Sequence, residues 1–175
     1  MIQFRLTPRV QALLEYTDDM ISEPKQSDAF LGNWYADIIQ LGEMDSLLLV
    51  CEKTYLSFVL LNIRSEHSDM LANGFINGLD HLLHLLHFAE RSIPRLMQGL
   101  EVMSIAAATD KKLLRVLDNV GLLYTEEVAQ RGGLDHCNVE DVMKRINAFP
   151  HPTLGNQSPV KATKTLLRNN DLSLH

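Results

Sequence analysis

The stretch from Leu31 to Leu61, LGNWYADIIQLGEMDSLLLVCEKTYLSFVLL, limits the fold of this chain more than any other. It contains three short segments rich in β-branched and aromatic residues. Gly42 and the polar run Glu52-Lys53-Thr54 separate these segments. Segments of this composition with short polar connections predict consecutive strands. We therefore expect an antiparallel meander of three strands near the N-terminus.

Elements on both sides of the meander complete the expected fold. Residues 1–6 alternate at period two and predict a first strand. Thr7 followed by Pro8 predicts a helix start, residues 18–28 predict an exposed loop, and residues 101–108 predict one returning strand. Caps and apolar spacing predict further helices at about 66–91, 93–100, 110–131, 138–148 and 160–168. We predict an α+β fold in which a small, mainly antiparallel sheet is covered by helices and the C-terminal third is helical.

Charge is distributed unevenly along the 175 residues. Residues 1–143 hold 11 lysines and arginines against 21 aspartates and glutamates, a balance of −10, whereas residues 144–175 hold five against one, a balance of +4. We interpret residues 1–137 as an α+β core domain and residues 138–175 as a basic helical C-terminal extension packed on it. A basic end on an acidic body often marks an interaction segment. It can equally be a basic helix that docks onto its own acidic body.

Composition excludes several classes of protein. With 46% hydrophobic and 22% charged residues the chain can bury a core, which excludes wholesale disorder. No stretch approaches the roughly 18 uncharged apolar residues of a membrane helix, and the alternating residues 1–6 lead us to expect no signal peptide. Cys51 and Cys137 form no pattern and are expected to be free thiols, which favours a cytoplasmic protein. The motifs of nucleotide-binding loops and of serine hydrolases are missing, so these chemistries are poorly supported.

Three histidines, His81, His84 and His87, recur at every third position of an expected helix. They fall within about 120° of one another around the helix axis, and Asp80 lies on the same side. One interpretation is a metal site, or a His/Asp proton-transfer site, on one helical face. The other interpretation is the solvated polar face of an amphipathic helix, which the lack of an i,i+4 pair of zinc ligands favours. No other cofactor is expected.

Basic side chains near the C-terminus are the candidate partner-binding residues. The last expected helix carries three of them at positions i, i+3 and i+7: Lys161, Lys164 and Arg168. Two further basic residues, Lys144 and Arg145, precede this helix in the chain. This pattern favours contact with phosphates or with an acidic partner, although a basic surface that compensates an acidic body has the same pattern.

The tryptophan of the meander is a further candidate. Trp34 and Tyr35 occupy adjacent strand positions and so point to opposite faces of the sheet. Trp34 is expected in the core, with a partner-binding surface as the alternative. Asn33, next to it, is a candidate for polar contacts to a ligand.

The first two thirds of the chain resembles an uncharacterised prokaryotic family of short proteins, classed as a domain of unknown function. The resemblance rests on the opening strand with Thr7, on Leu31-Gly32-Asn33-Trp34-Tyr35-Ala36, on Leu47-Leu48-Leu49-Val50, and on Lys53-Thr54. The family's later signature, a Thr followed by an Arg-Ser-Val-Leu-Gly-Ser-Met-Asn-like run, corresponds to residues 109–119. This chain departs strongly there, and the glycine and the Met-Asn pair are missing.

A shorter resemblance lies in residues 149–167, FPHPTLGNQSPVKATKTLL. Leu154-Gly155 followed by Ser158-Pro159 is similar to a turn of a toxin-binding antitoxin domain and to the end of some transposase integrase domains. This resemblance implies a role in regulation or in mobile elements, an analogy at the level of a motif.

These observations favour a non-enzymatic binding or regulatory protein that acts through a macromolecular partner. The expected partner is a protein, with nucleic acid as an alternative through the basic C-terminus and a homo-oligomer also open. No membrane partner is expected. The rival hypothesis is a small metal-dependent enzyme that uses the face formed by His81, His84 and His87.

Overall fold

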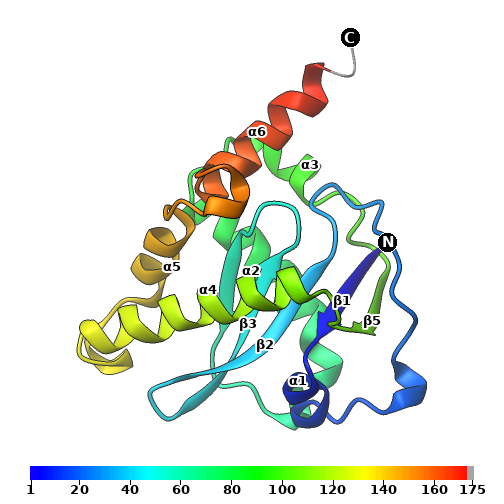
Figure 1. The fold of residues 1–175 in the computed structure, drawn as a ribbon, viewed down its shortest axis with the longest axis vertical. Helices are drawn as coiled ribbons and strands as arrows, with labels where there is room; N and C mark the ends of the chain where they lie inside the picture. Colours follow the sequence, from blue (N-terminus) through cyan, green and yellow to red (C-terminus); the bar gives the residue numbers. More distant parts are fainter. Residues whose placement is uncertain (173–175) are drawn as a thin grey trace.

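The computed structural model describes residues 1–172, apart from the side chains at positions 68, 69 and 172. Within this range a single sheet has helices on both faces, with α4 on one face and α2 on the other (Figure 1). The strands are β1 (Ile2–Leu6), β2 (Trp34–Leu41), β3 (Met44–Cys51), β4 (Ser57–Leu60) and β5 (Met103–Ala107). The α-helices are α1 (Pro8–Leu13), α2 (Leu71–Leu85), α3 (Ile93–Leu96), α4 (Lys111–Gln130), α5 (Val139–Asn147) and α6 (Pro159–Leu172).

The strand order is β4-β3-β2-β1-β5. Strands β2, β3 and β4 form the expected antiparallel meander, whereas β1 pairs in parallel with both of its neighbours, β2 and β5. The α+β class is therefore confirmed, and the sheet is mixed. Parallel neighbours require a crossover connection, and both pairings have one. The connection from β1 to β2 contains α1, and the connection from β4 to β5 contains α2 and α3.

An aromatic cluster fills the core between the sheet and α2. Phe75 of α2 lies against Phe4 of β1 and Trp34 of β2, at ring-centroid distances of 4.8 and 5.1 Å in edge-to-face geometry. Phe58 of β4 lies 5.7 Å from Trp34. Gly78 of α2 permits this packing, since a Cβ there would lie 2.5 Å from the Phe58 ring.

The opposite face of the sheet packs against α4 and α5. The small Gly121 brings α4 close to the sheet, because a Cβ atom at this position would lie 3.1 Å from the Ile39 side chain. Tyr124 of α4 is buried, and its hydroxyl donates to the carbonyl of Ser57 at the start of β4. Asn147 at the end of α5 contacts the same residue, so α4 and α5 both attach to the edge strand β4.

The helix α2 is shorter than the range of 66–91 that the sequence predicts. Residues 65–70 form a 3-10 helix, and the α-helix begins at Leu71, which is buried against the core. It ends at Leu85 because His87 takes a left-handed conformation, with φ of 57°. The His87 and Phe88 amides donate to the carbonyls of His84 and Leu83, the Schellman pattern of a helix end.

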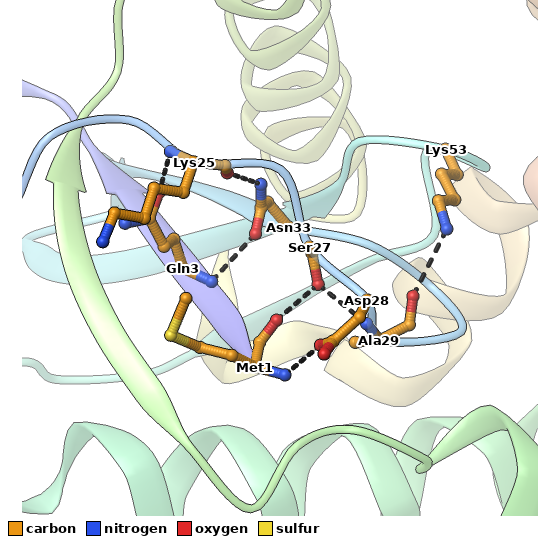
Figure 2. A network of polar contacts seen from close by, with 8 residues as sticks. All are labelled: Met1, Gln3, Lys25, Ser27, Asp28, Ala29, Asn33 and Lys53. Atoms are coloured by element: carbon orange, nitrogen blue, oxygen red, sulfur yellow. Dashed lines mark hydrogen bonds and ion pairs between the residues drawn. The ribbon is translucent and has the colours of Figure 1, made fainter.

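A strap formed by residues 22–29 runs along β1, as Figure 2 shows. Gln3 is buried and fixes the strap by accepting from the Lys25 amide at 2.7 Å and by donating to the carbonyl of Glu23 at 3.0 Å. Asn33 is also buried; it accepts from the Gln3 amide and donates to the carbonyl of Lys25. The side chains of this segment are largely exposed, as expected of residues 18–28, but its backbone is anchored to the sheet.

Candidate functional site

The histidine candidates turn towards different partners. His81 Nε2 lies 2.7 Å from Glu140 Oε1 of α5, whereas His84 Nδ1 lies 2.8 Å from the carbonyl oxygen of Asp80 and its Nε2 lies 3.3 Å from Glu90 Oε1. The hydrogen bond to the Asp80 carbonyl is the main cause that raises the pKa of His84, and the nearby carboxylates add to it. The left-handed backbone of His87 lies just past the end of α2, so His87 does not continue the helical face that carries His81 and His84.

The structure therefore does not gather the three histidines and Asp80 in one place. In the part of the chain that the structure describes, no group of three or more His, Cys, Asp or Glu side chains is arranged to hold a metal ion. The arrangement resembles the solvated polar face of an amphipathic helix, the second interpretation given above.

Trp34 and Asn33 are not available to a partner. Trp34 is 0% exposed inside the aromatic cluster, so it belongs to the core, the first of the two interpretations. Asn33 directs its polar atoms to β1 and the strap and contacts no open surface.

Two of the basic candidates are already engaged within the molecule. Lys144 Nζ lies 3.9 Å from Asp141 Oδ1 on the same helix, α5. Arg145 Nε lies 2.8 Å from Glu127 Oε1 of α4, and its guanidinium covers the ring of Phe149. Lys144 and Arg145 thus belong to α5 and not to the basic face of α6. Their positive charges compensate carboxylates of the acidic body.

The other three basic candidates form an exposed stripe on α6, the basic stripe of Lys161, Lys164 and Arg168. Among the described residues none of the three has an ion-pair partner, and Lys164 Nζ only approaches the ring of Phe88 at 5.9 Å. The helix extends away from the sheet (Figure 1), and Arg95 holds its far end through Asp171 at 2.6 Å.

A second basic feature lies between the start of α4 and the short 3-10 helix η5 (Pro152–Leu154). It is a cavity of about 500 Å³, called the basic pocket below. Its lining residues are Lys111, Lys112, Arg115, Val116, Asn119, His151, Pro152 and Thr153. Lys111, Lys112 and Arg115 form no ion pair with another described residue.

Tyr55 fixes the wall of the basic pocket. The rings of Tyr55 and His151 meet edge to face at 5.5 Å, and the Thr153 hydroxyl donates to the Tyr55 hydroxyl at 3.2 Å. Burial lowers the pKa of His151, which favours the neutral form of its ring. Its Nε2 atom is buried and has no hydrogen-bond partner among the described residues, which is unusual for a buried polar atom.

The sequence interpretation missed the basic pocket. Lys111, Lys112 and Arg115 occupy positions i, i+1 and i+4 directly after the helix cap Asp110, and this spacing was an available signal. The sequence did not link His151 to these cations, because the contact between residues 111–119 and 151–153 depends on the tertiary fold.

Another cavity of about 500 Å³ lies on the other side of α4, beside α1 and the β2–β3 hairpin. It contains the buried carboxylate of Asp37, which accepts from Arg9 at 2.6 Å and from the Thr7 hydroxyl at 2.7 Å. Protein groups already satisfy this carboxylate, so Asp37 offers no unpaired charge to a ligand in this cavity.

The fold defines the class of this chain: an α+β protein with a mixed five-stranded sheet, whose candidate sites are basic surfaces. A family model described as Domain of unknown function (DUF6933) matches residues 3–162, and the chain belongs to that family. The resemblance to a family of unknown function is thus confirmed, and the match extends past the first two thirds into α6. No curated protein and no solved structure matches the chain.

None of the helices in residues 1–172 is long and apolar enough to cross a membrane. Both cysteines in this range are free. Cys51 is buried, and that burial raises the pKa of its thiol, which disfavours the reactive thiolate.

Proposed function

We propose that this protein is a non-enzymatic binding protein that holds an acidic protein partner through the basic stripe of α6. One observation carries the proposal: three exposed cations on one face of a projecting helix have no ion-pair partner among the described residues. Such charges are free to form ion pairs across an interface, where they speed association and select the partner.

The charge of the whole molecule favours a protein partner over nucleic acid. The net charge is −6, so a long polyanion would be repelled by most of the surface. The basic stripe carries three positive charges and no aromatic residue that could stack on bases. An acidic patch on a protein matches a stripe of this size better than a continuous phosphate backbone does.

A regulatory role follows from the same proposal. A protein that occupies an acidic surface of its partner acts as an adaptor or an inhibitor. The antitoxin-like turn before α6 favours an inhibitor, by analogy with a motif. We place this interaction in the cytoplasm, where free cysteines such as Cys51 and Cys137 persist.

Affinity purification of the tagged protein from its native cells, with and without nuclease, tests the proposal. We expect a stoichiometric, nuclease-resistant protein that is released by salt and is lost when Lys161, Lys164 and Arg168 are all replaced by Gln. The matched control is Lys111→Gln, Lys112→Gln and Arg115→Gln, which removes the same charge from the basic pocket and should retain the partner. Capture that disappears with nuclease, or that survives the α6 substitutions, would contradict the proposal.

A further inference from the structure

We propose that the basic pocket binds the phosphate group of a small organic ligand. The proposal concerns a site separate from the basic stripe of α6 and does not depend on the proposed function. Three cations that form no ion pair with another described residue line one cavity of about 500 Å³, together with His151 and Thr153 on a wall fixed by Tyr55.

The cations at the start of α4 oppose an ordinary preference of helices. The N-terminal turn of a helix carries partial positive charge, so acidic side chains stabilise it and basic ones do not. Here the first turn holds Lys111 and Lys112 and no acidic residue, and Arg115 follows one turn later. Asp110 compensates only in part, because its carboxylate already caps the amides of Lys112 and Leu113. A bound anion would relieve this repulsion, and local rules of this kind are broken most often at functional sites.

The opposite wall carries the imidazole of His151 and the hydroxyl of Thr153. The His151 backbone is held by a bridge to Gln157, and its ring is held by Tyr55. The Nε2 atom of this ring is buried and has no hydrogen-bond partner among the described residues, so a ligand reaches it only after a local movement of the pocket wall. The Thr153 hydroxyl, oriented by Tyr55, lies in the same wall.

The size and the lining of the basic pocket indicate an organic phosphate rather than a bare ion. Its volume is in the range of about 300–1,000 Å³ that is typical of small-molecule sites. Val116, which is buried, and Pro152 give it an apolar part next to the cations. A phosphate monoester with an apolar group matches both parts, whereas inorganic phosphate would use only the charged one.

Binding of phenyl phosphate and of inorganic phosphate, measured by isothermal titration calorimetry at constant ionic strength, tests this inference. We expect phenyl phosphate to bind the wild-type protein more tightly than inorganic phosphate. The pocket variant, Lys111→Gln with Lys112→Gln and Arg115→Gln, should bind phenyl phosphate at least about tenfold more weakly, since each charged hydrogen bond to phosphate contributes strongly. These residues are exposed, so circular dichroism should report an unchanged fold.

The α6 variant, in which Lys161, Lys164 and Arg168 are replaced by Gln, is the matched control with the same loss of charge. We expect it to bind phenyl phosphate as the wild-type protein does. The substitution His151→Phe, which keeps the ring packed on Tyr55 and removes its nitrogens, should weaken binding without loss of the fold. Equal weakening by the pocket and α6 variants, equal affinity for the two phosphates, or no binding by the wild-type protein would overturn the inference.

Discussion

Replacement of Trp34 by alanine is expected to lower the free energy of unfolding by about 3–5 kcal/mol, the usual cost of removing a buried aromatic side chain. Trp34 is fully buried and contacts Phe58 and Phe75, so its removal leaves a cavity between the sheet and α2. A loss of this size is a large part of the roughly 5–15 kcal/mol that stabilises an ordinary domain. Urea unfolding followed by circular dichroism measures it.

Trp34→Phe is the informative control for this prediction. The indole Nε1 of Trp34 is buried and has no hydrogen-bond partner among the described residues. Phenylalanine removes that unpaired donor while it keeps most of the aromatic contact, so we expect a much smaller loss than with alanine. If Trp34→Ala cost less than about 1 kcal/mol, far below the usual range, Trp34 would not be part of the core.

Asn147→Ala is expected to cost about 2–3 kcal/mol, since it leaves buried polar groups of the edge strand without partners. Asn147 is 0% exposed; its Oδ1 accepts from the Ser57 amide at 2.9 Å, and its Nδ2 donates to the Ser57 carbonyl at 2.8 Å. It thereby pairs with β4 in the way a further strand would. Asn169→Ala on the exposed side of α6 is the control and should change stability by less than about 0.5 kcal/mol.

The same substitution should also affect the basic pocket. Asn147 ends α5, and the segment that follows carries His151. Loss of the contact to Ser57 frees this segment, so hydrogen exchange in residues 148–158 should rise more than in β2 or β3. A uniform rise across the whole chain would mean that Asn147 stabilises the fold without holding the pocket wall.

Much of the fold could be predicted because it is encoded locally. The meander follows from its composition and short connections, and the side chains of Asp110 and Asn138 cap α4 and α5 by accepting from amides of the first turn. The direction of β1 could not be predicted in this way. Alternation along a strand is the same for parallel and antiparallel neighbours, and β5, which pairs with β1, lies about a hundred residues away.

The candidate site was less predictable than the fold. The basic stripe of α6 is visible because helical spacing alone puts its three residues on one face. The basic pocket is not visible in this way, because it requires α4 to lie next to residues 151–153, which tertiary packing decides. Regular spacing of His81, His84 and His87 did not reveal their separate surroundings, because His81 turns to Glu140 and the helix ends before His87.

Lysine footprinting of the captured complex tests the central claim, that α6 contacts the partner, most directly. The free protein and the complex are labelled with an acetylating reagent, and the modified lysines are quantified by mass spectrometry. We predict that Lys161 and Lys164 are protected in the complex, whereas Lys144, paired with Asp141 on α5, keeps its labelling. Equal labelling of Lys161 and Lys164 in the free protein and in the complex would contradict the account.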